Sequence, residues 1–352
     1  MGPHAALGLS SILALVLASE LVVRKLERLA KFYGLSEVVI GLTVVSIGTS
    51  LPEIASHLVS SVQIVSGLGD SRTISATVLG GNIGSDVVQQ TLILGLVVVA
   101  VGGFRFSREF LVRGYAPMIG TTLLTLILAW DGMLTRLDGV VLLGVFLLYM
   151  SVLYSTRSDI IQETGTNPPS DDPRRDAVIS VVALLTVVVS AHVLFRTVEF
   201  YVNRTSLEGS LIGVLVLGIG AASPEMSTAI MGVREGAEGI SLGTLIGSNI
   251  TNPLLGIGLG AVISTYHVPR PLIYWDLPME TITAAILLTY LLTKDDVGVF
   301  LGRVAGAIGR PETKLKLELV EERHLGRVGA AMLIALYFVY LFGRISYFPT
   351  DF

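Results

Sequence analysis

The chain has 352 residues, of which 52% are hydrophobic and only 15% are charged, and its formal net charge is −4. A soluble domain carries about 25% charged residues, so the composition excludes an ordinary soluble domain and indicates a membrane protein with several spans. The small net charge gives no sign of a nucleic-acid partner. The absence of cysteine excludes disulfides, thiolate metal sites and cysteine nucleophiles.

Ten apolar runs in the sequence are long enough to cross a bilayer, and we expect all of them to be helices because a helix satisfies its own backbone in lipid. The fold class predicted is therefore an all-α integral membrane protein with ten transmembrane helices. The runs cover residues 5–23, 37–64, 74–102, 109–130, 136–155, 176–201, 207–232, 239–265, 272–293 and 327–347.

Lys and Arg residues are concentrated in one alternate set of the loops between these runs. The positive-inside rule assigns that set to the cytoplasm. Residues 156–175 and 294–326 are the longest loops of the set. The rule then predicts that both termini are extracytoplasmic and that the chain is a multi-pass protein of the cell membrane.

One segment of the chain occurs twice. Residues 41–53 (GLTVVSIGTSLPE) align without a gap with residues 213–225 (GVLVLGIGAASPE), and residues 80–96 resemble residues 243–259. Five spans precede the second copy, and an odd number of spans inverts it, which gives the inverted repeat of many secondary transporters. The predicted organisation is a first five-helix repeat in 1–155, a cytoplasmic linker in 156–175 and a second, inverted repeat in 176–352.

The repeated segment places a glutamate, Glu53 or Glu225, within an apolar run, directly after Pro52 or Pro224. A carboxylate at this depth is costly and indicates a functional site. Proline removes a backbone N–H, so the carbonyl four residues earlier loses its helical partner. Carboxylate, carbonyl and hydroxyl oxygens together are hard ligands, which suit Ca²⁺, Na⁺ or Mg²⁺ rather than soft metals.

The paired GTSLPE-type and Gly-Ser segments resemble the alpha repeats of the cation/calcium exchanger superfamily, and most closely those of prokaryotic sodium/calcium exchangers. The resemblance covers all ten spans. It implies a secondary antiporter, not an enzyme, that needs no cofactor and exchanges Ca²⁺ for Na⁺ by alternating access. Carried over by position, the resemblance assigns ion ligands to Ser46 (carbonyl), Thr49, Ser50, Glu53, Ser85, Gln89, Gly218 (carbonyl), Ala221 (carbonyl), Glu225, Ser248 and Asn252.

Two departures from the family pattern bear on the ions. Ala221 and Ala222 stand where the family usually has Thr and Ser, so a hydroxyl ligand is missing at Ala222, and Gln89 stands where the family often has Asn. The coupling ion, Na⁺ or H⁺, and the choice of Ca²⁺, Mg²⁺ or another divalent cation therefore stay open. From a different class of function, a passive cation channel also stays open, as does the oligomeric state, including a monomer.

Three other polar positions need an interpretation. Asp86 follows Ser85 within a span, and it is either a further ion ligand or proton carrier, or a residue paired with another helix. His57 lies one turn beyond Glu53, where a hydrogen-bonded packing role is favoured over a proton relay. Asp276 and Glu280 follow Tyr274 and Trp275, and aromatic residues of this kind predict an interfacial position for both carboxylates.

Overall fold

The structure is a computed structural model that describes residues 2–107, 110–155, 168–202, 214, 218–291 and 322–351. A helix lies in the described part of each of the ten predicted ranges. Among the described residues, five helices are long and apolar enough to span a membrane, and a bent pair of helices makes a sixth. The chain is thus a mostly helical membrane protein. Residues 156–167 of the predicted linker lie outside the described residues.

The helices follow one another along the chain with short π-helical insertions, labelled η. In the first part they are α1 (Gly2–Tyr33), α2 (Glu37–Ile40), η1 (Gly41–Val45), α3 (Ser46–Thr49), α4 (Leu51–Val65), α5 (Ser71–Val88), η2 (Gln89–Ile93), α6 (Leu94–Val101), η3 (Leu111–Tyr115), α8 (Ala116–Leu128) and α9 (Arg136–Ser155). In the second part they are α10 (Pro173–Val202), α12 (Gly218–Ala221), α13 (Ser223–Arg234), α14 (Glu238–Thr251), η6 (Asn252–Ile257), α15 (Gly258–Ile263), η7 (Leu272–Asp276), the helical segment 277–291 and α17 (Arg327–Tyr347).

Both repeated segments break just before their proline. The helix made by α2, η1 and α3 ends at Thr49 and resumes at Leu51, with a bend of 43° between the two parts. The second copy breaks at the matching place, because α12 ends at Ala221 and α13 begins at Ser223. Proline cannot continue the backbone ladder of the preceding turn, so the breaks agree with the sequence. Each break puts a glutamate in the first turn of the helix that follows.

π-helical turns recur at matching positions of the two halves. η2 begins at Gln89 and η6 at Asn252, and η3 begins at Leu111 and η7 at Leu272. A π-helical turn inserts an extra residue into the helix and is frequently found at functional sites. These turns were not predicted, because the hydrophobic pattern of the sequence does not distinguish them from α-helix.

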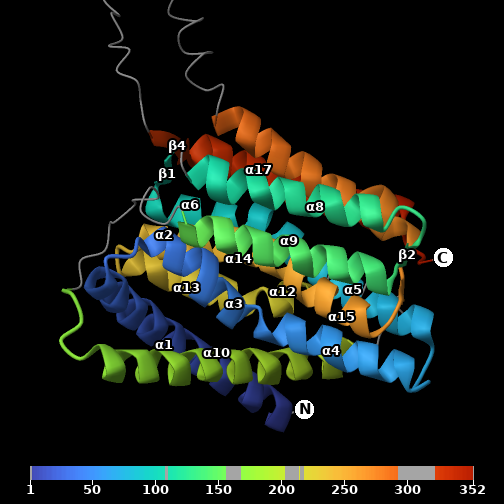
Figure 1. Ribbon diagram of the computed structural model, residues 1–352, viewed down its shortest axis with the longest axis horizontal. Coiled ribbons are helices and arrows are strands. Elements are labelled where there is room, and N and C mark those ends of the chain that lie inside the picture. The colour runs from blue at the N-terminus through green and yellow to red at the C-terminus, as the bar shows by residue number, and fades with distance from the viewer. Residues whose placement is uncertain are drawn as a thin grey trace, which may run out of the picture.

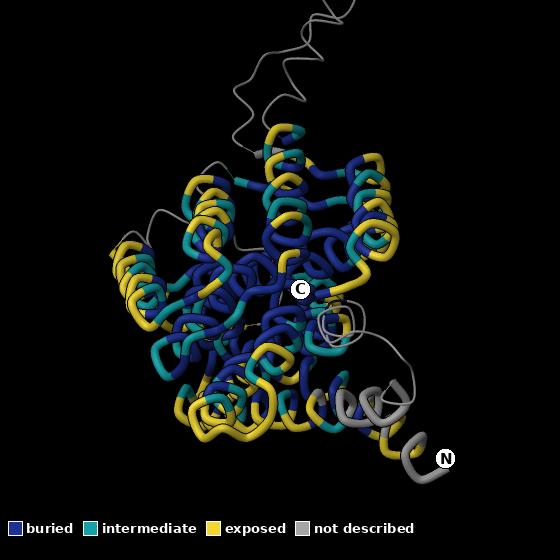
Figure 2. The backbone as a smooth tube through the Cα atoms, turned by 90° about the vertical axis from the view of Figure 1, so that its right-hand side faces the viewer, coloured by how far each residue is buried: buried dark blue, intermediate teal, exposed yellow. Residues whose placement is uncertain are grey.

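The helices form a buried centre and a separate pair at one side. The spans built on α5 and α14 lie at the centre, each with 78% of its apolar window buried, and Figure 2 shows buried backbone there with exposed helix faces around it. α1 and α10 pack most extensively against each other and run together along one side of the molecule (Figure 1). The molecule thus has a compact core with one helix pair packed along its side.

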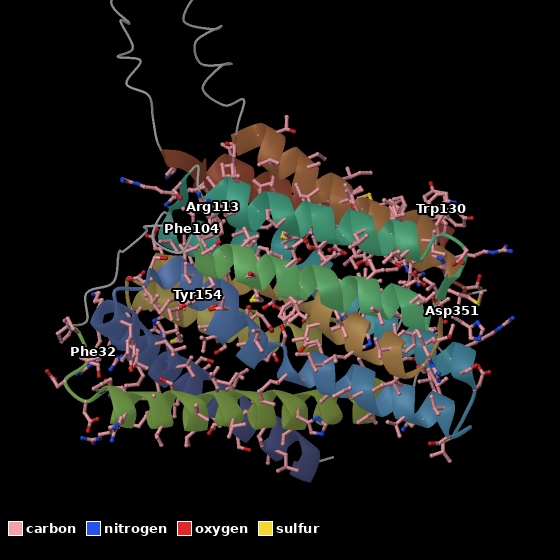
Figure 3. The ribbon with its side chains drawn as sticks, viewed as in Figure 1. Phe32, Phe104, Arg113, Trp130, Tyr154 and Asp351 are labelled. Carbon is pink, nitrogen blue, oxygen red and sulfur yellow. The ribbon has the colours of Figure 1, made fainter. Side chains whose placement is uncertain are left out.

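Two short antiparallel ribbons join loops of the two halves. β1 (Gly103–Ser107) pairs with β4 (Glu322–Gly326), and β2 (Met133–Leu134) pairs with β3 (Tyr266–His267). The ribbons lie outside the predicted spans. β1 and β4 are at the opposite end of the helices from β2 (Figure 1), and Figure 3 likewise places Phe104 of β1 at the end opposite to Trp130 and Asp351.

Candidate cation site

The two repeated glutamates lie together in the buried centre. Glu53 and Glu225 are 4% and 0% exposed, and their charges are close enough to repel each other. Each is paired with the serine of the Gly-Ser helix in its own half. The Ser85 hydroxyl donates to Glu53 Oε1 at 3.5 Å, and the Ser248 hydroxyl donates to Glu225 Oε1 at 3.4 Å. Each half thus contributes one glutamate carboxylate and one serine hydroxyl to the buried centre.

Glycine holds the four helices of this centre close together. A Cβ atom added to Gly84 of α5 would lie 2.6 Å from the Cα of Val214 in the second half. A Cβ atom added to Gly247 of α14 would lie 2.7 Å from the Cβ of Ser46 in the first half. Only glycine allows backbones to approach this closely. The Gly-Ser helix of each half is therefore packed against the broken helix of the other half.

Several oxygen atoms in this centre have no hydrogen-bond partner among the described residues. They are Ser50 Oγ, Glu53 Oε2, Glu225 Oε2, Asn249 Oδ1 and Asn252 Oδ1. Buried polar atoms are nearly always hydrogen-bonded, and exceptions mark a place where an ion or water completes the bonding. The unpaired atoms are all oxygens that can act as acceptors, and two belong to carboxylates. This set fits a hard cation and not an anion.

The remaining predicted ligands are buried around the same centre. The Gly218 carbonyl accepts the Ala222 N–H at 3.0 Å, which leaves a second lone pair on its oxygen. The Ser46 carbonyl accepts the Ser50 N–H at 3.0 Å and also the Thr49 hydroxyl at 3.3 Å. Thr49 lies close to Glu225 of the other half, while its hydroxyl donates to the Val45 carbonyl at 3.0 Å. Ala221 is partly buried and offers only its carbonyl.

Two side-chain hydrogen bonds cross between the halves beside the glutamates. Asn249 Nδ2 donates to Gln89 Oε1 at 3.1 Å, and Asn252 Nδ2 donates to Asp86 Oδ1 at 2.7 Å. The amide nitrogen of Gln89 in turn donates to the Ser85 hydroxyl at 3.0 Å. The amide oxygen of Gln89 is therefore already engaged, whereas that of Asn252 is unpaired. Of the two amides predicted as ligands, Asn252 is better prepared to bind a cation.

Within the described residues, no three His, Cys, Asp or Glu side chains converge on one point. A site of two carboxylates completed by neutral oxygens does not require such a cluster. Two negative charges balance one divalent cation, and Ca²⁺ accepts backbone, amide and hydroxyl oxygens as well as carboxylates. The donor set therefore fits Ca²⁺ better than zinc or copper, which favour nitrogen and sulfur.

Asp276 and Glu280, for which the sequence predicts an interfacial position, are both buried inside the protein. Their exposures are 0% and 2%. Asp276 forms an ion pair with the buried Arg344 of α17 at 3.1 Å, and Glu280 Oε1 accepts a hydrogen bond from Thr122 of α8 at 2.7 Å. Helices distant in sequence thus cover both carboxylates. His57 is also buried, and its Nδ1 lies 3.1 Å from the hydroxyl of Tyr266, as the packing interpretation expects.

Comparison with known proteins places this geometry in a family. The sequence profile described as "Sodium/calcium exchanger protein" matches residues 4–155 and 176–346. The inner membrane protein YrbG of Escherichia coli is 29% identical over 283 residues, which cover 76% of this chain and 82% of that protein. The sodium/calcium exchanger MaX1 of Methanosarcina acetivorans is 25% identical over 325 residues, which cover 81% of this chain and 90% of that protein.

Solved structures of the sodium-calcium exchanger NCX_Mj have the same fold. One of them, soaked with Na⁺ and Sr²⁺, superposes with a TM-score of 0.72 at 20% sequence identity, covering 97% of this chain and 98% of the exchanger. The fold thus matches over nearly the whole chain, and the family profile matches most of the sequence. The chain is a multi-pass membrane transporter rather than an enzyme, and it belongs to the sodium/calcium exchanger family.

Proposed function

We propose that this cation exchanger moves Ca²⁺ against Na⁺ and that Glu53 and Glu225 bind the two ions in turn. The observation that carries the proposal is the meeting of these buried carboxylates, each with one unpaired oxygen, at the contact between the two halves. The names of similar proteins support the choice of ions, since MaX1 is a sodium/calcium exchanger and NCX_Mj structures were soaked with Na⁺ and Ca²⁺ or Sr²⁺.

Coupling follows from the shared ligands. One Ca²⁺ neutralises both carboxylates, and Na⁺ ions that occupy the same oxygens displace it. An empty centre would leave two like charges buried next to each other, which is costly. The transporter therefore changes its access preferentially when ions fill the site, and this requirement makes the two fluxes depend on each other.

We further propose that α1 and α10 move as a pair across the site. Ion pairs join α1 to the start of α10 and its preceding residues: Lys25 to Asp176 at 2.7 Å and Arg28 to Asp171 at 2.9 Å. Arg24 of α1 makes two contacts, at 2.9 and 3.0 Å, with Glu235 at the end of α13. The first pairs would travel with the moving helices, and the Arg24–Glu235 pair would form and break as they move.

The repeat organisation and the orientation belong to the same proposal. We propose repeats in 1–155 and 176–352 joined by a cytoplasmic linker in 156–175, with both termini outside. The matching helix breaks, π-helical turns and glycine contacts support the repeats. Cysteine labelling of this cysteine-free chain from each side of the membrane tests the orientation.

Uptake of ⁴⁵Ca²⁺ into proteoliposomes under an imposed Na⁺ gradient or an imposed pH gradient tests the exchange. Uptake driven by the Na⁺ gradient at equal pH is the expected result. Uptake driven only by the pH gradient would replace Na⁺ by H⁺ as the coupling ion. Equal uptake without any counter-ion gradient would indicate a passive channel, and uptake of Mg²⁺ without Ca²⁺ would reassign the divalent ion.

A further inference from the structure

A polar cavity lies at the end of the molecule that carries the β2–β3 ribbon. Its volume is about 420 Å³, and residues of both halves line it. Arg72 comes from the first turn of α5, Trp130 and Asp131 come from the turn after α8, and His267 and Arg270 come from β3 and the loop that follows it. Trp130 marks this end of the molecule in Figure 3. The ion ligands predicted from the sequence are not among the lining residues, so the cavity is separate from the glutamate site.

Hydrogen bonds between segments distant in sequence hold the walls of the cavity. The Val268 N–H donates to the Gly132 carbonyl at 2.8 Å. The His267 N–H donates to the hydroxyl of Ser75 in α5 at 3.2 Å. The cavity is therefore formed by the folded chain itself, as ligand sites usually are.

The charged residues of the cavity leave one net positive charge. Arg72 and Arg270 are its cationic residues and Asp131 is its acidic residue, with His267 counted as neutral. Asp70, two residues before Arg72, caps the start of α5 and does not line the cavity. Within the described residues, the guanidinium of Arg270 has no ion-pair partner. A guanidinium binds phosphate oxygens in a fork, and the single negative charge of a phosphodiester balances the cavity.

Aromatic and aliphatic side chains place the cavity at the level of lipid headgroups. Trp130 and Tyr274 both line it, are 61% and 54% exposed, and contact each other edge to face with ring centroids 5.9 Å apart. Exposed Trp and Tyr gather where a membrane meets water. Ile127 and Leu123 of α8 precede Trp130 at helical spacing and are also exposed. Side chains at this spacing share one face, so an apolar face leads from the cavity toward the middle of the membrane.

We propose that this cavity binds the phosphate of a phospholipid in the leaflet at the β2–β3 end. Arg72 and Arg270 hold the phosphate oxygens, and the acyl chains lie along the exposed face of α8. The net positive charge disfavours a cation, and a free anion would make no use of the apolar face. The bound lipid joins the start of α5 in the first half to the loop after β3 in the second half. The inference does not depend on the proposed ion exchange.

Thermal unfolding of the purified protein in detergent, after removal of copurified lipid, tests the site. The probes are dioleoylphosphatidylglycerol, dioleoylglycerol, which has the same acyl chains without phosphate, and sodium phosphate at constant pH and ionic strength. The phospholipid should raise the Tm by at least about 2 °C, because a ligand that binds only the folded state stabilises it. The other two probes should not reproduce this rise.

Replacing both arginines should remove the response to phosphate. Arg72→Gln with Arg270→Gln should reduce the rise to that given by dioleoylglycerol. Arg136→Gln is the matched control, because Arg136 is exposed at the start of α9, directly after β2, but is not among the residues that line the cavity. It should keep the full rise.

A binding measurement replaces the unfolding measurement if the double variant does not fold. Arg270→Gln alone should bind radiolabelled phosphatidylglycerol about tenfold more weakly than the unchanged protein, since a hydrogen bond to a charged group is lost. Unchanged binding by this variant would contradict the site.

Four results would overturn the proposal. Equal rises with the phospholipid and with dioleoylglycerol would mean that the acyl chains bind without the phosphate. A rise with sodium phosphate that needs the two arginines would assign the cavity to a free anion. A phospholipid response that survives in the double variant, or that Arg136→Gln removes equally, would place the lipid elsewhere on the molecule.

Discussion

The two halves of the glutamate site share a backbone and differ in chemistry. Both have a helix break before a proline, a serine donating to a glutamate and a glycine in close contact with the other half. The first half presents the hydroxyls of Thr49 and Ser50, whereas the second has Ala221 and Ala222 at the matching positions. The backbone arrangement around the glutamates is therefore duplicated in the two halves, whereas the set of ligand groups is not.

The cross-half hydrogen bonds show the same contrast. Asn249 donates to the neutral amide of Gln89, and at the matching place Asn252 donates to the carboxylate of Asp86. The two bonds join matching positions of the halves, at 3.1 and 2.7 Å, but only one includes an acidic side chain. We therefore propose that a few side chains on a nearly symmetrical backbone set the ion preference, which single substitutions can test.

Removing either glutamate charge should have the largest effect. Glu53→Gln and Glu225→Gln each keep the shape of the side chain and halve the charge of the site. A buried cation that loses one of its carboxylate partners loses about 3 kcal/mol or more, on the order of a hundredfold in affinity. We expect both variants to fold and to lose ⁴⁵Ca²⁺ exchange. Exchange at the rate of the unchanged protein in either one would refute the glutamate site.

Replacing the two closely packed glycines by alanine should test whether the backbone packing between the halves is symmetrical. Gly84→Ala and Gly247→Ala each place a methyl group against backbone or Cβ atoms of the other half. Overpacking of this kind costs roughly 1–3 kcal/mol, so both should lower the Tm by similar amounts. Gly120→Ala is the control, because its added Cβ meets nothing within 4 Å. A large fall in Tm for only one of the two variants would contradict symmetrical packing between the halves.

Shortening Gln89 should change the ligands of the first half. Gln89→Asn cannot span the distance to Asn249, so the cross-half hydrogen bond is lost, which is worth about 1 kcal/mol, or a few-fold in an equilibrium constant. The freed amide oxygen should raise the apparent Ca²⁺ affinity in exchange assays. Asn249→Ala frees the same oxygen without shortening Gln89 and should act in the same direction. Opposite effects of the two would reject this interpretation.

Restoring a hydroxyl in the second half should have the smallest effect. Ala222→Ser adds the group that Ser50 supplies in the first half, in a buried position. We expect a lower Na⁺ concentration for half-maximal exchange, by a factor of a few, since one neutral ligand contributes about 1 kcal/mol. If exchange by the unchanged protein and by Ala222→Ser is independent of Na⁺, the coupling ion is not Na⁺ and the added hydroxyl does not act as a Na⁺ ligand.

Local sequence was sufficient for one part of the site. The offset between the repeats predicted that Glu53 and Glu225 are equivalent, and the prolines predicted the helix breaks that the structure has at Ser50 and Ala222. Spacing along one helix also predicted that Ser85 and Gln89 share a face, and the Gln89 amide donates to the Ser85 hydroxyl. These features depend on backbone chemistry and on periodicity, both of which a single sequence displays.

Contacts between the halves could not be predicted in this way. The partners of Glu280 were not predicted: its backbone carbonyl accepts from Gln90 and its carboxylate accepts from Thr122, which lie 190 and 158 residues away in the chain. The pairing of Asp86 with Asn252 likewise depends on how α5 packs against η6. The sequence around these residues does not indicate their hydrogen-bond partners, because tertiary packing determines which residues meet.

The two β-ribbons have a consequence for how the chain is made. Gly103 of β1 is aligned with Gly326 of β4, so the strand that completes this ribbon leaves the ribosome more than two hundred residues after the first. The earlier helices therefore enter the membrane with a strand edge still unpaired, and an unpaired edge is an aggregation hazard. The β1–β4 ribbon can therefore form only once the chain before the last helix has been made, and truncation before β4 should leave the edge of β1 unpaired.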